Sequence, residues 1–281
     1  MQISKGGIAF FDSGIGGLTV LHEAKQLLRG EIFYYYGDNL RAPYGNLPDE
    51  KIMRFVTEAF DIFQSLEVKA VVLACNTATA VCADSLRKKY PFSIIGAEPA
   101  VFPAVKAGGE VLVLSTRATF QSQRFIKLLE RARERYPQAQ ITPKPCDKLA
   151  GAIERNLRNP SFDFTPYLPP ADKKYTAVVL GCTHYIYIKQ QISAYYHCPT
   201  VDGNEGIASR LAFMLNATAF SPKNKKYREE RPLVTSPLSA TPNGGEDAVL
   251  FEYLGAPIFF LGAEKHYNKS IYEQMFAIPC K

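Results

Sequence analysis

The stretch VVLACNTA, residues 71–78, is an apolar run that ends in a cysteine followed by small polar residues. The stretch VVLGCTHY, residues 178–185, repeats this pattern in the second half of the chain. Continuous runs of β-branched residues are typical of strands that are buried on both faces of a parallel sheet. In such sheets, side chains that bind or react lie just beyond the carboxyl ends of the strands. The two stretches therefore predict an α/β fold in which Cys75 and Cys182 occupy equivalent, functional positions.

Strand and helix patterns alternate around the first stretch. Residues 18–28 are helix-like, and apolar residues recur at three- and four-residue spacing from Ile52 to Leu66, which indicates one face of an amphipathic helix. Strands that alternate with helices predict right-handed βαβ units and a doubly wound sheet. The strands expected here are residues 8–11, 32–36, 68–74 and 92–95.

The same order of parts begins again near Glu98, where we expect the first domain boundary. Asp12 precedes Cys75 by 63 residues, and Thr116 precedes Cys182 by 66. This similarity predicts an internal duplication. The fold class is therefore expected to be α/β, with two similar doubly wound domains, mainly parallel sheets, pseudo-symmetry, and the active site in the cleft between the domains. The elements expected in the second half are strands 111–114 and 177–180 and a helix over residues 120–136.

Composition narrows the class of protein. The 281 residues are 47% apolar and 21% charged, as in an ordinary globular enzyme, and no apolar run approaches the roughly 20 residues that cross a membrane. The first residues lack the pattern of a signal peptide, so we expect a cytoplasmic protein. The net charge of +6 is spread along the chain except for residues 223–231, KNKKYREER, whose two glutamates favour a solvated loop. We expect no nucleic-acid partner.

The six cysteines are expected to be free thiols. No CxxC pair or His-x-x-x-His spacing is present, so no metal site is predicted. We interpret Cys82, Cys198 and Cys280 as small buried apolar groups. Cys75 and Cys182 have the same alternative as space-filling residues, but their repeated setting favours a chemical role.

Two thiols from two similar halves would face each other across the cleft. One thiol could remove the α-proton of an amino acid from one face while the other delivers a proton to the opposite face. A thiol at a helix N-terminus is expected to have a pKa below the free value of about 8.5, because the helix dipole favours the thiolate. The arrangement thus favours stereoinversion of an amino acid without a cofactor.

Six short motifs follow one another along the chain: FDSGIGG (11–17), RAPYG (41–45), ACNTA (74–78), EPA (98–100), STRAT (115–119) and LGCTHY (180–185). In this order and spacing they resemble those of glutamate racemases in the cofactor-independent aspartate/glutamate racemase superfamily. The resemblance implies that L- and D-glutamate are interconverted by proton transfer through two cysteines, that no cofactor is used, and that the product supplies peptidoglycan synthesis. The substrate would be the only expected small-molecule partner, and a homodimer is possible.

The resemblance also implies residue roles. The implied catalytic residues are Cys75, Cys182, Asp12, His184 and Glu154. The implied substrate-binding residues are Asp12, Ser13, Tyr44, Gly45, Asn76, Thr77, Thr119, Thr183 and His184. Apart from the resemblance, hydroxyl and amide side chains suit a substrate carboxylate and ammonium because they add no net charge.

The end of the chain is ambiguous from its residues alone, because expected strands 233–235 and 258–261 fit either half. The resemblance implies that the chain returns to the first domain, which gives a first domain of residues 1–98 plus 214–281 and a second of residues 99–213. The chain departs from the family in having Ile186 and Tyr187 where a proline and a leucine are usual, and in its C-terminal third, including residues 235–248, which matches poorly.

Three alternatives compete with this function. A nucleotide-binding protein is suggested by Gly14-x-Gly16 after a strand and by Asp38 at the end of the next, but Thr19 replaces the third glycine of that fingerprint and no Walker lysine is present. The chain could instead racemise aspartate or another acidic amino acid. It could also be a non-catalytic binding protein, although the intact pair of cysteines disfavours this.

Overall fold

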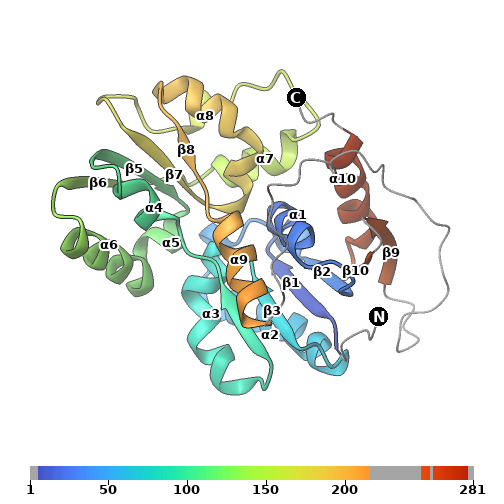
Figure 1. Cartoon of the computed structure of the whole chain (residues 1–281). Coiled ribbons are helices and arrows are strands. Elements are labelled where there is room, and N and C mark those ends of the chain that lie inside the picture. Colours follow the sequence, from blue (N-terminus) through green and yellow to red (C-terminus); the bar gives the residue numbers. More distant parts are fainter. Residues whose placement is uncertain (1–5, 216–247, 254–255, 278–281) are drawn as a thin grey trace.

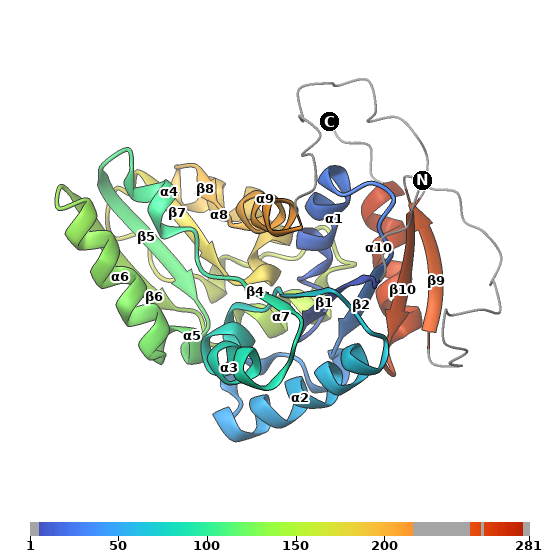
Figure 2. The same cartoon turned by 60° about the horizontal axis from the view of Figure 1, so that its bottom comes forward.

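The computed structural model describes residues 6–215, 248–253 and 256–277, which are built around two sheets (Figures 1 and 2). Both figures show the green-to-yellow middle of the chain around one sheet, and the blue and cyan start together with the red end around the other. The helices are α1 (Leu18–Leu27), α2 (Asp49–Ser65), α3 (Asn76–Lys89), α4 (Val101–Val105), α5 (Arg117–Gln121), α6 (Gln123–Arg135), α7 (Leu149–Asn156), α8 (Lys189–Tyr196), α9 (Asn204–Met214) and α10 (Lys265–Ala277). Short 3-10 turns are η1 (Asn39–Arg41), η2 (Tyr44–Asn46), η3 (Thr165–Tyr167) and η4 (Thr183–Ile188).

The larger sheet has the strand order β4-β3-β1-β2-β10-β9. All neighbouring strands are parallel except β9, which pairs antiparallel with β10 at the edge. The strands are β1 (Ile8–Asp12), β2 (Phe33–Gly37), β3 (Ala70–Leu73), β4 (Ser93–Gly96), β9 (Ala248–Tyr253) and β10 (Ala256–Leu261). Because successive side chains point to opposite faces, Phe10 packs with α1, α9 and α10, whereas Phe11 packs with α2 and α3.

The smaller sheet has the order β6-β5-β7-β8 and is parallel throughout. Its strands are β5 (Gly109–Ser115), β6 (Ala139–Pro145), β7 (Ala177–Gly181) and β8 (Thr200–Val201). One core of this sheet is formed with α7 and α8, and the other with α4 and α6. The order β6-β5-β7-β8 reproduces β2-β1-β3-β4 of the larger sheet strand for strand. The predicted fold class, two similar α/β units with mainly parallel sheets, is confirmed.

Some local predictions differ from the structure. The helix expected over residues 120–136 is two helices, because Ser122 has an extended backbone and its hydroxyl caps α6 by accepting from the Phe125 N–H at 3.1 Å. Strands β6, β8 and β9 were not predicted. The expected strand 233–235, the basic segment 223–231 and Cys280 lie outside the described residues.

The division into residues 1–98 plus 214–281 and residues 99–213 stays a prediction. Strands β9 and β10 lie in the larger sheet with β1 to β4. The division assigns nearly all of helix α9 to the second domain. In the structure, however, Ala208, Leu211 and Ala212 of this helix belong to the core of the larger sheet. None of the helices in the described ranges is long and apolar enough to cross a membrane.

Lys25 of α1 is a buried ionisable residue next to the larger sheet, and its side chain is 1% exposed. Its Nζ donates to the carbonyl oxygens of Tyr253 and, at 2.9 Å, of Ala256, so it ties α1 to the β9–β10 hairpin. Burial lowers the pKa of Lys25 to about 7, although Glu252 acts in the opposite direction. The amine is therefore largely neutral in the folded protein at mildly basic pH.

We expect the Lys25→Met variant to lose a pH dependence of stability. The pKa of this lysine is about 7 when folded and about 10.4 when unfolded, so the unfolded chain binds the extra proton between these values. The free energy of unfolding that Lys25 contributes should therefore rise with pH across this window, by at most about 1.4 kcal/mol per pH unit. Urea unfolding at pH 7 and pH 9.5 checks this. The free energy of unfolding of the wild type minus that of the variant should increase between the two pH values, and a constant difference would contradict the assignment.

Candidate active site

The implied site residues lie where the strand order of each sheet reverses. Asp12 ends β1 and Cys75 follows β3, and these neighbouring strands lead to helices on opposite faces of the larger sheet. Thr116 and Cys182 follow β5 and β7 in the corresponding places of the smaller sheet. A crevice outside the carboxyl ends of the strands forms at such a switch point. The duplicated fold thus supplies two equivalent positions, and the contacts described below join them.

Cys75 is the N-cap of α3, and its side chain is buried. Its sulfur accepts a hydrogen bond from the Ala78 N–H at 3.4 Å and lies 3.4 Å from the Ser13 hydroxyl oxygen. Burial, together with the nearby Asp12 carboxylate, raises the pKa of Cys75 to about 11 despite these two contacts. The expectation of a lowered pKa is therefore wrong for this thiol, because the loss of hydration outweighs the helix N-terminus.

Asp12 connects the two halves. It is fully buried; one carboxylate oxygen accepts from the Gly14 N–H at 2.9 Å, and the other accepts from the Thr183 hydroxyl at 3.0 Å. Burial raises the pKa of Asp12, while His184 and the two hydrogen bonds act to lower it. The carboxyl group therefore lies in a setting that favours uptake of a proton more than an exposed aspartate does.

Cys182 has a different partner. Its sulfur lies 3.8 Å from Nδ1 of His184, and Nε2 of the same ring contacts a carboxylate oxygen of Glu154 from α7. Burial by itself lowers the pKa of His184, but Glu154 and Cys182 outweigh it and raise the pKa well above its ordinary value. The imidazole is therefore a buried cation between a carboxylate and a sulfur.

Two glycines let the halves approach closely at this point. A Cβ on Gly14 would lie 2.9 Å from Oε2 of Glu154 and 3.0 Å from Nε2 of His184, and a Cβ on Gly16 would lie 2.3 Å from the Thr183 hydroxyl oxygen. Both glycines belong to the FDSGIGG motif, and they are also the two glycines of the alternative nucleotide fingerprint. Their place against the second half shows why larger residues do not fit.

Three threonine hydroxyls meet on the other side of Cys75. Thr77 of α3 lies 2.8 Å from Thr116 and 3.3 Å from Thr119, oxygen to oxygen, and Thr116 donates to Thr119 at 3.0 Å. All three are buried. Thr116 was not predicted as a site residue, although its position after β5 corresponds to that of Asp12 and Ser13 after β1. A hydroxyl that can either donate or accept suits a carboxylate ligand.

The remaining predicted residues lie at the edge of this cluster. The Tyr44 hydroxyl donates to Asp38 and its ring is in the core of the larger sheet, while Gly45 abuts Thr116. Asn76, the first residue of α3, has a buried side-chain oxygen without a hydrogen-bond partner among the described residues. The same is true of one Glu154 oxygen, Oε1.

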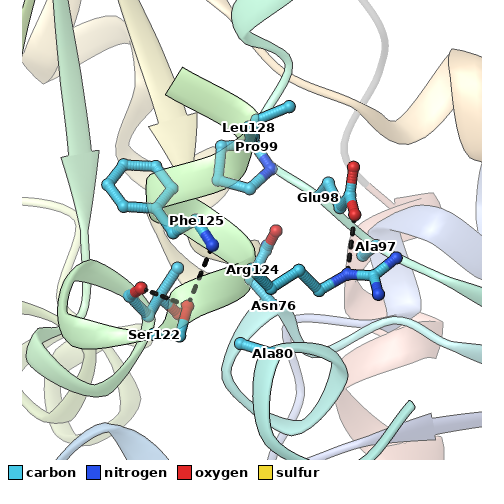
Figure 3. A pocket seen from close by; sticks show the side chains of 10 residues that line it. Asn76, Ala80, Ala97, Glu98, Pro99, Ser122, Arg124, Phe125 and Leu128 are labelled. Atoms are coloured by element: carbon cyan, nitrogen blue, oxygen red, sulfur yellow. Dashed lines mark hydrogen bonds and ion pairs between the residues drawn. The ribbon is translucent and has the colours of Figure 1, made fainter. Parts of the chain in front are cut away.

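Asn76 also lines a small pocket between the two halves, shown in Figure 3. In this view a dashed line marks the Glu98–Arg124 ion pair, with 2.6 Å between Oε1 and Nε, and both residues line the pocket together with Asn76. A second pocket shares Asn76 and Glu98 and extends to Thr183. Neither lining includes Cys75 or Cys182. Both thiols are buried, with exposed fractions of 5% for Cys75 and 7% for Cys182.

No group of three or more histidine, cysteine, aspartate or glutamate side chains in the described ranges is arranged to hold a metal ion.

Comparison with known proteins gives a family match. The Asp/Glu/hydantoin racemase family matches residues 21–211. A glutamate racemase of Clostridium botulinum is 37% identical over 235 residues, which cover 80% of this chain and 90% of that protein. A glutamate racemase of Clostridium perfringens is 35% identical over 230 residues, covering 78% and 86%.

Solved structures agree with these relatives. A glutamate racemase isoform from Bacillus anthracis superposes with a TM-score of 0.65 at 30% identity, covering 75% of this chain and 82% of that one. Escherichia coli glutamate racemase, solved with L-glutamate and an activator, has a TM-score of 0.66 at 28% identity, covering 77% and 85%. The Campylobacter jejuni enzyme covers 98% of this chain with a TM-score of 0.69, and at 23% identity it supports the fold alone.

Proposed function

The chain belongs to the Asp/Glu/hydantoin racemase family, and we propose that it interconverts L- and D-glutamate by proton transfer between the substrate and Cys75 and Cys182. Membership of this family makes the protein an amino-acid racemase, which is an isomerase. The observation that carries the mechanism is that two enclosed thiols follow equivalent strands, each with its own ionisable neighbour, Asp12 on one side and His184 on the other.

The two thiols differ in their electrostatic setting, and this difference supports distinct resting roles. Cys75 has a raised pKa and is a neutral thiol, ready to donate a proton. The Cys182 sulfur faces the His184 imidazole at 3.8 Å, and we assign it the role of proton acceptor. In one direction, the Cys182 sulfur takes the α-proton, the electron pair remains on the α-carbon and substrate carboxylate, and Cys75 protonates the opposite face. The reverse direction exchanges the two roles.

Asp12 can complete the reverse direction. Cys75 must then be a base, and the Asp12 carboxylate next to it is the group that can receive its proton. Burial favours this uptake because it raises the pKa of Asp12. A catalytic acid or base of this kind is worth about 10²- to 10⁴-fold in rate.

The polar groups around the thiols suit a zwitterionic substrate. The hydroxyls of Thr77, Thr116 and Thr119 can donate to a substrate carboxylate, whose negative charge grows as the α-proton leaves. The unpaired side-chain oxygens of Asn76 and Glu154 can accept from the substrate ammonium. Because a buried acceptor without a partner costs about 1–3 kcal/mol, pairing these oxygens favours binding.

The resemblance to glutamate racemases is also the basis for three further parts of the proposal. The D-glutamate product would be used in peptidoglycan synthesis, the protein would act in the cytoplasm, and two copies would associate. These parts rest on the relatives and not on the geometry of the site.

An optical assay tests the proposed reaction. Purified protein, treated with chelator and free of bound chromophore, is incubated separately with each enantiomer of glutamate and of aspartate. We expect both glutamate enantiomers to approach zero rotation, faster than aspartate does. Greater efficiency with aspartate would assign the chain to the other acidic substrate. Activity that returned only with a divalent ion would overturn the cofactor-independent mechanism, and no conversion of any acid would favour a binding protein.

A further inference from the structure

Tyr187 lies in η4 and reaches across to the first half of the protein. Its hydroxyl donates to the backbone carbonyl oxygen of Ile15 at 2.8 Å, and it lies 3.6 Å from the sulfur of Met275 in α10. The half-buried ring packs against the cores of both sheets. Tyr187 therefore joins the turn that follows Cys182 to the loop that follows β1.

The loop that Tyr187 contacts, residues 13–17, lies against Cys75 and against the residues that surround Cys182. The Ser13 hydroxyl lies 3.4 Å from the Cys75 sulfur. One residue later, the α-carbon of Gly14 is so close to Glu154 and His184 that a Cβ would overlap them. A shift of this loop would thus disturb Cys75 directly and the partners of Cys182 at the same time.

Tyrosine hydroxyls hold this loop from both halves. Tyr35 of β2 donates to the Gly14 carbonyl at 2.8 Å from within the larger sheet, and Tyr187 donates to the next carbonyl from the smaller one. Burial, with Asp12 and Glu154 nearby, raises the pKa of Tyr187 well above its ordinary value, so the phenol keeps the proton that it donates.

We propose that Tyr187 is a positioning residue that holds the loop of residues 13–17 closed against the Glu154–His184 pair, and so sets the two thiols on opposite faces of one substrate. This role rests on the proposed function, because it acts through Ser13 and Gly14 on the groups assigned to proton transfer. The hydroxyl does not contact either thiol in the structure's hydrogen bonds; its effect passes through the loop backbone.

The contribution of one hydroxyl can be tested without disturbing the packing. The Tyr187→Phe variant keeps the ring between the two cores and removes only the donor. The matched control is Tyr196→Phe in α8, whose hydroxyl donates to the Pro169 carbonyl at 2.6 Å within the second half. Both variants lose one tyrosine-to-carbonyl hydrogen bond, but only the first loses one that joins the halves.

Hydrogen exchange and kinetics are measured on both variants of the full chain. In Tyr187→Phe, the amides of Leu18 and Thr19, which bond to the Ile15 and Gly16 carbonyls, should exchange faster than in wild type, and those of α3 should not. The value of kcat/KM for glutamate should fall about two- to tenfold, as expected for one hydrogen bond. The fall must be equal in both directions, because the two enantiomers have equal free energies. The Tyr196→Phe variant should show neither effect.

Each readout can overturn a different claim. Unchanged exchange at Leu18 and Thr19, or an equal change in Tyr196→Phe, would overturn the proposed tie between the halves. Faster exchange with unchanged kcat/KM would overturn the positioning role. An inactive wild-type protein with the expected exchange pattern would overturn the proposed function and the positioning role with it, while the tie itself would be supported.

Discussion

Replacing either Cys75 or Cys182 by serine is expected to lower racemisation of glutamate by about a thousandfold or more, within the range for loss of an acid–base group. A hydroxyl is a far weaker base than a thiolate, so the altered position can no longer accept the α-proton. The surviving thiol in each variant should still remove the proton from the one enantiomer that faces it. Cys198→Ser provides the control, because this buried residue lies between α8 and β8, outside the proposed site, and should keep full activity.

A glutamate analogue with chloride on the β-carbon separates the two half-reactions. Removal of the α-proton breaks the α-carbon–hydrogen bond, the electron pair forms a double bond to the β-carbon, and chloride leaves, so no second proton donor is required. Chloride release should therefore continue in each variant, from opposite enantiomers in Cys75→Ser and Cys182→Ser. If both variants prefer the same enantiomer, the mechanism with one thiol on each face is wrong.

Solvent deuterium gives an independent check in the unaltered protein. With one thiol on each face, deuterium should enter the inverted product much faster than it enters recovered substrate of the original hand. A single base serving both faces would label the two equally.

The sheets were predictable to the extent that their strands carry long apolar runs. Strands β1, β3 and β7 are buried on both faces, and their residues are apolar almost throughout. Strand β6 is AQITPKP, and it escapes such a pattern because it lies at an edge, where prolines are tolerated. Strand β8 is also an edge strand and spans only Thr200–Val201, too short to show any periodicity.

The positions of the thiols could be predicted, but their chemical states could not. The rule that functional residues follow the carboxyl ends of parallel strands depends only on local sequence. The pKa of Cys75 depends on its burial in the folded core and on the nearby Asp12, which no short stretch reveals. The partnership of Thr77 with Thr116 and the reach of Tyr187 to Ile15 are likewise contacts between distant segments. These pairs join the two repeats, and neither repeat alone specifies them.

The second large effect is expected at His184. In the His184→Asn variant, chloride release from the enantiomer that faces Cys182 should fall by about a hundredfold, the lower end of the range for an acid–base partner. The asparagine amide is neutral, so negative charge on the Cys182 sulfur loses the cation that lies 3.8 Å away. Release from the enantiomer that faces Cys75 should change by no more than about threefold, because the contacts of Cys75 with Ser13 and Ala78 are untouched.

Loss of the cation also removes the partner of Glu154, whose side chain is 14% exposed. Breaking a buried pair costs about 3–5 kcal/mol of stability, which is an upper limit for this partly exposed one. The double variant His184→Asn/Glu154→Gln removes the unpaired charge and should recover much of this stability without recovering activity. Glu154→Gln alone keeps the histidine but removes the main group that raises its pKa, so that pKa should fall because burial is then opposed mainly by Cys182. Its chloride release from the enantiomer facing Cys182 should consequently decrease more steeply between pH 6 and pH 8 than that of the unaltered protein. A flat profile in Glu154→Gln, or full activity in the double variant, would show that the imidazolium is not what supports Cys182.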